Sequence, residues 1–381
     1  MLHCTSCKRK YNEGINLRCE CGEPVEFPLQ TGDIKQGDTV WERYDDFFPN
    51  SPRISNSLGE GNTPFIKGNK LSKKFGLNVY LKNETQNPTW SFKDRGTFIG
   101  INKALESRIQ NIGTVSTGNM AASVAAYGRR FDINTKILVS SDISEKKLDQ
   151  ISIYQPNIIK VRGNYGELYY KSLDLGRKRD IYFINSDDPY RIEGYKSISY
   201  EIYEEGNIDY VIIPTSSGGL FRGITKGFLE LKESGYLDNL PRFVSVQSKG
   251  CSPIYNSYQS RKKEITMIQK PKTIAKAIAN PFPPSGNEVL RKLKRLDTLC
   301  LTVSDKEIIK AQKEIAKEGI FCQPASATGI AALNSLVENE DINKDDRFAS
   351  IVTGSGLKSN MISSSNKFIS SNLEDLEYYL D

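Results

Sequence analysis

Residues 87–96 read NPTWSFKDRG, and this stretch decides how the rest of the chain is interpreted. It follows an alternating apolar run at 79–82 that predicts a strand, and it precedes a run at 97–108 that predicts a helix. Lys93 therefore lies where a turn becomes a helix, beside backbone N–H groups that lack partners within the helix. Their positive potential favours the neutral amine, the form that attacks a carbonyl carbon. A solitary lysine of this kind is usually just solvated, so its meaning depends on its companions.

Three further stretches carry compatible chemistry in a fixed order. Residues 116–119 read STGN, residues 216–219 read SSGG, and residues 353–357 read TGSGL. Each follows a run that predicts a strand, and the first two also precede runs that predict helices. Backbone N–H groups at such a strand-to-helix junction bind anions, and glycine permits their close approach. The alternation of strands and helices predicts an α/β fold with parallel sheets.

Together these four stretches resemble the pyridoxal-phosphate enzymes of the tryptophan synthase β-subunit class, known as fold type II. Within that class they are most similar to the threonine synthase family, and the resemblance extends from Cys4 to about Lys358. It implies a two-lobe α/β fold with parallel-rich sheets. We expect a large cofactor-binding lobe from residues 29–105 and 190–381, a small lobe at 106–189, and a zinc-ribbon-like segment at 1–28.

The resemblance also implies a role for each motif residue. Lys93 would bear pyridoxal 5′-phosphate and act as the catalytic acid and base. The other expected contacts are Phe92, Asn119 and Thr353 with the cofactor ring, Ser216, Ser217, Gly218, Gly219 and Leu220 with its phosphate, and Ser116, Thr117 and Arg191 with the substrate. For Arg191 the residues leave a second interpretation open, a surface arginine paired with Asp187 or Glu193.

Four positions depart from the family pattern. Trp90 stands where these enzymes usually have glycine, and Met120 where they have threonine. Leu220 and Asp188 each replace an asparagine. Met120 and Leu220 remove polar groups from the region that receives the substrate's phosphate, and an inward-facing Asp188 would oppose an anion. The cofactor half of the expected site matches the family, whereas the substrate half does not match cleanly.

Four of the seven cysteines lie within the first 21 residues, as Cys4-x-x-Cys7 and Cys19-x-Cys21. Two close pairs can present four thiolates to one tetrahedral zinc ion, and such a site would be structural because no coordination position stays open. The second pair is tighter than usual, so a relic held by packing is the alternative. His3 is more simply a terminal residue than a ligand.

Composition narrows the functional classes. The net charge of +6 is spread along the chain without a long basic arm, so nucleic acid is not an expected partner. No run is long and apolar enough for a membrane span, and the first residues do not resemble a signal peptide. Seven cysteines in a chain of this size do not indicate a disulfide framework. We expect a cytoplasmic enzyme, a homodimer, that acts on a small amino-acid substrate.

Several expectations concern the remaining segments. Residues 26–57 predict a strap with a short helix that packs on the main body. A helix is expected from Tyr195 to Glu205, and residues 248–290 are expected to be rich in loops. Beyond Lys358 the composition predicts a loose tail with a short final helix.

Three functions are compatible with this sequence. The first is threonine synthase chemistry, in which O-phosphohomoserine and water give threonine and phosphate. The second is a paralogous β- or γ-replacement enzyme or dehydratase that uses another hydroxy or O-phospho amino acid. The third is a non-enzymatic zinc-ribbon binding protein with a degenerate enzyme fold, against which the intact Lys93 argues.

Overall fold

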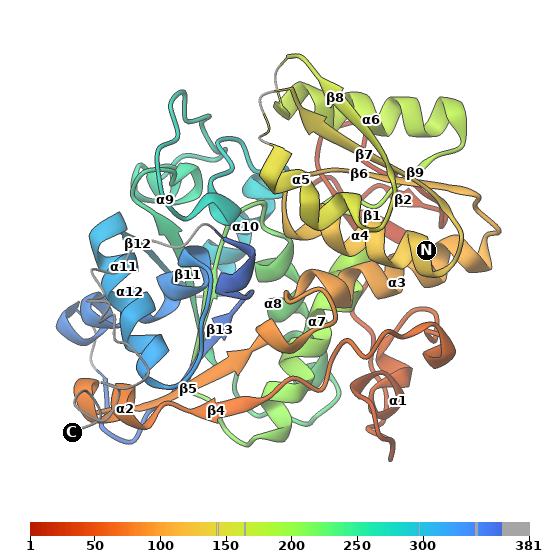
Figure 1. Cartoon of the computed structure of the whole chain (residues 1–381). Helices are drawn as coiled ribbons and strands as arrows, with labels where there is room; N and C mark the ends of the chain where they lie inside the picture. The colour runs from red at the N-terminus through yellow and green to blue at the C-terminus, as the bar shows by residue number, and fades with distance from the viewer. Residues whose placement is uncertain (142, 144, 164, 297, 340–341, 360–381) are drawn as a thin grey trace, which may run out of the picture.

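Two separate sheets organise the chain in the computed structural model, which describes residues 1–359 except 142, 144, 164, 297 and 340–341 (Figure 1). The large sheet has the order β12 (Leu299–Val303), β11 (Arg242–Ser248), β10 (Tyr210–Pro214), β13 (Arg347–Val352), β5 (Asn78–Asn83), β4 (Phe65–Lys67). The small sheet has the order β8 (Asn157–Val161), β7 (Asn134–Ser140), β6 (Asn111–Val115), β9 (Tyr182–Phe183). All pairs are parallel except β4 with β5, as the alternating pattern predicts.

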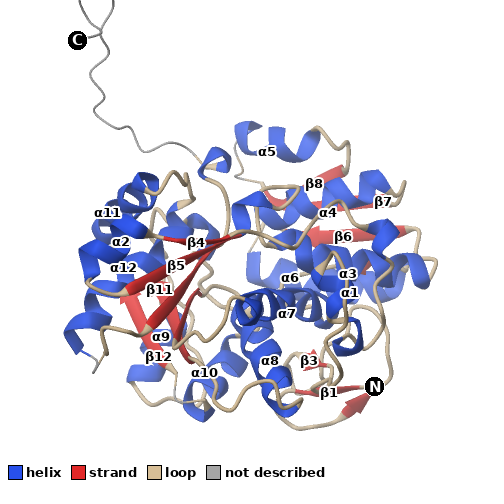
Figure 2. Cartoon of the chain, turned by 90° about the horizontal axis from the view of Figure 1, so that it is seen from below, coloured by secondary structure: helices blue, strands red, loops and turns tan. Residues whose placement is uncertain are grey.

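Helices cover both sheets and fill the space between them (Figure 2). They are α1 (Val40–Arg43), α2 (Asn69–Phe75), α3 (Lys93–Glu106), α4 (Asn119–Arg130), α5 (Glu145–Ser152), α6 (Tyr165–Arg179), α7 (Pro189–Glu204), α8 (Gly219–Glu233), α9 (Pro253–Gln259), α10 (Gly286–Arg295), α11 (Asp305–Lys317) and α12 (Pro324–Asn339). No described helix is long and apolar enough to cross a membrane.

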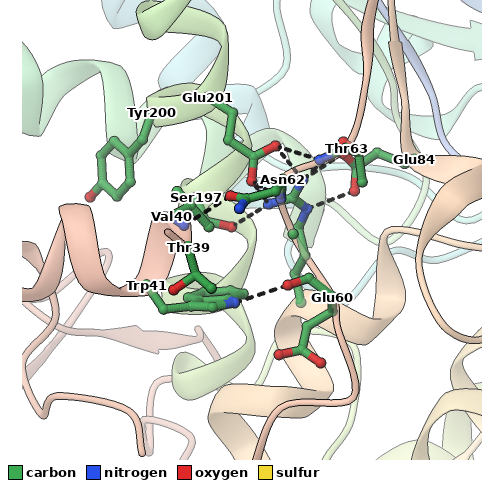
Figure 3. Close-up of polar contacts among 12 residues, drawn as sticks. Thr39, Val40, Trp41, Glu60, Asn62, Thr63, Glu84, Ser197, Tyr200 and Glu201 are labelled. Atoms are coloured by element: carbon green, nitrogen blue, oxygen red, sulfur yellow. Dashed lines mark hydrogen bonds and ion pairs between the residues drawn. The ribbon is translucent and has the colours of Figure 1, made fainter. Parts of the chain in front are cut away.

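Helix α7 is the centre of the molecule, packed between α3 and α8. Its residues 189–202 are all buried, including charged ones. Glu201 accepts hydrogen bonds from Arg95 of α3 at 2.6 and 2.7 Å and from the backbone N–H of Asn62 (Figure 3). On the α8 side, Lys226 pairs with Glu193. Because both contacts are buried ion pairs, α7 fixes α3 and α8 relative to each other.

Glycines allow α7 to approach α3 closely. A Cβ on Gly194 would lie 2.2 Å from the carbonyl oxygen of Arg95, and a Cβ on Gly96 would lie 2.7 Å from the ring of Tyr195. A larger residue at Gly194 would have to move the backbone of α3, and one at Gly96 would have to move the buried ring of Tyr195, so both glycines set the spacing of the two helices at the start of α3.

The strap expected at 26–57 packs against the main body as predicted. Its short helix α1 begins with a capping box formed by Thr39 and Glu42, and its aromatic residues are buried. The indole Nε1 of Trp41 donates to the carbonyl oxygen of Glu60 at 3.0 Å (Figure 3). The strap therefore supports the loop that precedes β4.

Two expectations about elements were incomplete. Helix α7 begins at Pro189 and not at Tyr195, because the Asp188 side chain accepts from the N–H groups of Tyr190 and Arg191 and Pro189 suits the first helical position. The segment 248–290 contains α9 and the start of α10. The expected tail helix lies outside the described residues.

The first 26 residues form a three-stranded antiparallel sheet of β2 (Lys10–Tyr11), β1 (Leu2–Cys4) and β3 (Val25–Glu26). It holds four cysteines together: their Sγ atoms all lie within 4.8 Å of one another. This N-terminal sheet packs beside β9 of the small sheet and beside α10, through contacts considered below.

Candidate active site

Lys93 is the first residue of α3, as the sequence predicts. Its Nζ lies 4.4 Å from the ring centroid of Phe92 and 5.6 Å from that of Tyr195. No described carboxylate pairs with it. Burial, followed by the charge of Arg191, lowers the pKa of Lys93 to about 7. A large share of the amine is therefore unprotonated near neutral pH, as a nucleophile requires.

The loop between β10 and α8 has the shape of an anion site. Gly218 adopts φ +94°, and a Cβ there would lie 2.8 Å from Ser285 and Val289. A Cβ on Gly219 would lie 2.5 Å from the carbonyl oxygen of Ser186. Only glycine fits at both positions, and no side chain caps the N-terminus of α8. Its first N–H groups are thus free to bind an anion.

Asn119 begins α4 and lies beside the loop that follows β13. Its Nδ2 would lie 3.2 Å from a Cβ on Gly354. The amide of Gln323 pairs with it in both directions, at 2.9 and 3.2 Å. Gln323 was not among the expected site residues, since nothing in its local sequence indicates that it would meet Asn119.

Thr353 directly follows β13, and its backbone lies beside that of Phe92, the residue before Lys93. Its carbonyl oxygen accepts from the N–H of Phe92 at 3.1 Å. Its hydroxyl lies 2.9 Å from that of Ser326, a second residue that the sequence did not single out. The Ser326 hydroxyl also accepts from the N–H of Gly354 at 3.0 Å, which orients the pair.

Ser116 and Thr117 connect β6 to α4. The N–H of Ser116 still pairs with Leu138 of β7, and its hydroxyl accepts from the N–H of Gly118. A Cβ on Gly118 would meet no atom within 4 Å, and no side chain caps α4. The N-terminus of α4 is therefore a second open anion-binding end.

Arg191 lies in the first turn of α7 and is completely buried, so the surface interpretation is wrong. Its guanidinium donates to the hydroxyls of Tyr195 and Thr97 and to the carbonyl oxygen of Lys93, at 2.6 to 3.1 Å. Its two suggested partners bond elsewhere: Asp187 to Arg18, and Glu193 to Lys196 and Lys226. No described carboxylate pairs with Arg191, so its charge remains available to an anion.

Comparison with known proteins identifies this arrangement. The family described as pyridoxal-phosphate dependent enzymes matches residues 56–354. The threonine synthase of Methanocaldococcus jannaschii is 37% identical, covering 94% of this chain and 93% of that protein. The threonine synthase of Methanosarcina acetivorans is 35% identical, covering 94% and 92%. This protein belongs to the threonine synthase family of pyridoxal-phosphate dependent enzymes.

The fold is shared more widely among these enzymes. The processed form of threonine deaminase isoform 2 from Solanum lycopersicum superposes with a TM-score of 0.67 at 21% identity, covering 93% of this chain and 91% of that one. This likeness confirms the α/β architecture of fold type II.

The residues of this threonine synthase family member fit pyridoxal phosphate. The open N-terminus of α8 suits the phosphate, and the unpaired, low-pKa Lys93 suits the aldehyde. The hydroxyl of Ser91, two residues before Lys93, is buried without a hydrogen-bond partner among the described residues. An orphaned donor at this place is accounted for when a polar ligand fills the site.

The four departures from the family pattern have distinct structural settings. Met120 and Leu220 are buried as second residues of α4 and α8, so both anion-binding ends carry an apolar side chain. Asp188 points into its own helix as a cap, and burial raises its pKa to about 7 against the opposing effect of its hydrogen bonds. Trp90 is 49% exposed and has φ +62°, a strained conformation for a bulky residue.

Proposed function

We propose that this protein is a threonine synthase that converts O-phosphohomoserine and water to threonine and phosphate. The observation that carries the proposal is the completely buried guanidinium of Arg191, which has no carboxylate partner among the described residues and donates to the carbonyl oxygen of Lys93. A buried arginine without a carboxylate partner favours an anionic group, and the phosphate of the substrate supplies it.

Each residue has a task in this reaction. When bound, pyridoxal phosphate supplies an electron sink that makes the α-proton of an attached amino acid acidic. Lys93 takes the proton from Cα and then from Cβ, for which its pKa of about 7 is well matched. Arg191 binds the phosphate that leaves from Cγ, and Ser116 and Thr117 orient the substrate carboxylate.

The remaining expected residues hold the cofactor. Ser216, Ser217, Gly218, Gly219 and Leu220 would hold its phosphate, Asn119 would donate to its 3′-oxygen, and Thr353 and Phe92 would contact its ring. A hydroxyl at Thr353 does not enforce protonation of the pyridine nitrogen, which favours elimination and replacement over transamination. The contacts of Gln323 with Asn119 and of Ser326 with Thr353 support these two assignments.

Met120 and Leu220 favour one competing function, a paralogue for another hydroxy or O-phospho amino acid, because they place apolar groups at both helix ends. Phosphate release from O-phosphohomoserine separates the two. We expect release that depends on Lys93. An enzyme that releases none, but turns over O-phosphoserine, O-phosphothreonine or free threonine, is the paralogue.

We further propose that Cys4, Cys7, Cys19 and Cys21 bind one structural zinc ion. Neighbouring sulfurs lie 3.3 to 3.5 Å apart, close to the spacing of about 3.8 Å that tetrahedral zinc imposes on four thiolates. Although burial opposes it, hydrogen bonds from Tyr11 and Cys21 lower the pKa of Cys19 to about 6, which favours a thiolate. All seven cysteines are free, which supports a reducing, cytoplasmic location. The homodimer stays a prediction.

A further inference from the structure

The family match begins at residue 56, so it assigns no role to the cysteine-cluster segment, residues 1–28. Yet this segment contacts the small sheet on one side and helix α10 on the other. Toward the small sheet, the amide of Asn16 donates to the carbonyl oxygen of Ile181 at 2.7 Å and accepts from the N–H of Phe183 at 2.8 Å. Toward α10, Glu23 accepts from Asn287 and Arg291, each at 2.7 Å. The segment thus bridges two parts of the main body.

Arg18, adjacent to Cys19, makes the most central of these contacts. One guanidinium nitrogen donates to the carboxylate of Asp187, and another donates to the carbonyl oxygen of Pro284 at 2.9 Å. The guanidinium also lies 5.1 Å from the ring centroid of Tyr170. The Arg18 and Asp187 side chains are only 10% and 6% exposed, so water screens their attraction weakly.

Each target of Arg18 precedes a residue that supports the proposed site. Asp187 precedes Asp188, whose carboxylate accepts from the N–H groups of Tyr190 and Arg191 at 3.0 and 3.2 Å. This cap fixes the first turn of α7 and hence the guanidinium of Arg191. The tyrosine hydroxyl of Tyr169 also donates to Asp187, which anchors the same turn to α6.

Pro284 precedes Ser285, which supports the loop between β10 and α8. The N–H of Ser285 donates to the carbonyl oxygen of Ser217 at 3.1 Å, and its hydroxyl accepts from Arg222 at 3.0 Å. The turn and this loop also touch each other, because Gly219 packs directly on the carbonyl of Ser186. Arg18 therefore bonds to both sides of that contact, to the side chain of Asp187 and to the backbone of Pro284.

We propose that Arg18 is a positioning residue for the active site. By joining Asp187 to Pro284, it fixes Arg191 relative to the loop of residues 216–219, and it makes this geometry depend on the cysteine cluster beside it. The planar fork of arginine can serve two acceptors at once, whereas the ammonium of lysine is a point charge. The distance between the substrate-phosphate and cofactor-phosphate groups is the quantity that Arg18 sets.

Two measurements on the full-length, cofactor-loaded protein test this role. The first is hydrogen exchange at the amides of Tyr190 and Arg191, which needs no substrate. In Arg18→Ala we expect exchange at least tenfold faster than in the wild type. The matched control is Arg9→Ala, which removes an exposed ion pair with Glu20 from the same segment and should leave this exchange within twofold.

The second measurement is KM for O-phosphohomoserine, and it rests on the proposed function. It distinguishes a residue that positions the substrate site from one that only stabilises the fold. Arg18→Ala should raise KM for O-phosphohomoserine about tenfold while kcat and cofactor content change less than threefold. Arg18→Lys should lie between, because it keeps the charge but not the fork; this variant also decides the question if Arg18→Ala does not fold. Faster exchange with an unchanged KM, or exchange equal to that of Arg9→Ala, overturns the proposal. If the wild type does not use O-phosphohomoserine, the proposed function fails. The role of Arg18 is then tested by the KM for the phosphorylated or hydroxy amino acid that the enzyme does use.

Discussion

At the scale of single residues, the site differs from the rest of the interior in how its cations are paired. Lys82 and Arg95 are as deeply buried as Arg191, but both bond to Glu201, and Arg95 also bonds to Glu84. Lys93 and Arg191 have no such partner among the described residues. A charge held away from water without a counterion lowers the free energy of unfolding, so Lys93 and Arg191 destabilise the cofactor-free protein.

Replacing Lys93 by methionine should therefore stabilise the cofactor-free protein at pH 7, by about 2–4 kcal/mol. The unfolded chain keeps this proton up to a pKa of about 10.4 and the folded chain only up to about 7, so folding releases a proton between those values. The cost is complete below pH 7 and disappears above about pH 10.4. Urea unfolding at pH 7 and pH 10 should show the gain shrink with rising pH. Lys82→Met, the paired control, should destabilise; a loss of stability in both variants at pH 7 would contradict the argument.

Replacing Arg191 by alanine should weaken binding of a phosphorylated substrate by about 2–5 kcal/mol, since the substrate's charge would then be buried unpaired. Cofactor content should not change. Because the charge of Arg191 helps to lower the pKa of Lys93, that pKa should rise in the cofactor-free variant. Isothermal titration with substrate and a pH titration of lysine reactivity measure the two effects. Unchanged kinetics on every phosphorylated substrate would exclude Arg191 as the anion-binding group.

The residues that sequence reasoning found, and those that it missed, differ in a physical way. Lys93, Asn119 and Gly218 carry local signals, because each lies at the start of a helix that follows a strand, and both patterns are visible in the sequence. Gln323 and Ser326 carry none, since their roles arise from contacts with residues 204 and 27 positions away. A single sequence does not encode such pairing in any local pattern.

At the scale of elements, α7 is the least typical helix of the fold. A helix buried on all sides is usually apolar, but this one carries Arg191, Glu193, Lys196 and Glu201 inside the protein. Periodicity therefore indicated its presence but not its burial. The helix also starts six residues before the expected Tyr195, because Asp188 caps it and Pro189 occupies its first position.

Glu201→Gln should destabilise the protein by about 3–5 kcal/mol, because Arg95 and Lys82 would share one fewer buried counterion (Figure 3). Glu204→Gln is the matched control three residues along, since its pair with Arg43 is partly exposed; we expect about 1 kcal/mol or less. Despite its burial, Glu201 has a pKa lowered to about 2 by Arg95 and Lys82. Its contribution is therefore present above about pH 4.3 and lost as the pH falls toward 2, so denaturation at pH 7 and pH 3 should show the difference between the variants narrow.

At the scale of the whole molecule, the cysteine cluster should act on the geometry around the active site and not on the binding of the cofactor. Protein purified without chelator should contain one zinc per chain, and Cys19→Ser should abolish it. Removal of the metal should increase proteolysis within residues 1–28 while the absorbance of the lysine-bound cofactor remains. Metal analysis and a visible spectrum measure both effects; protein without zinc, or loss of colour together with the metal, would contradict this division of roles.

The position of β13 has a consequence for how the protein is made. This strand, the last in the chain among the described residues, lies in the middle of the large sheet, between β10 and β5. A nascent chain that has left the ribosome only as far as residue 340 therefore holds two unjoined pieces of sheet, with the inner edges of β5 and β10 exposed to other chains. The loops that carry Lys93 and Gly218 meet only when β13 is inserted. Cofactor capture should therefore wait until β13 is inserted, and before that insertion the exposed strand edges make the chain prone to aggregation and a target for chaperones.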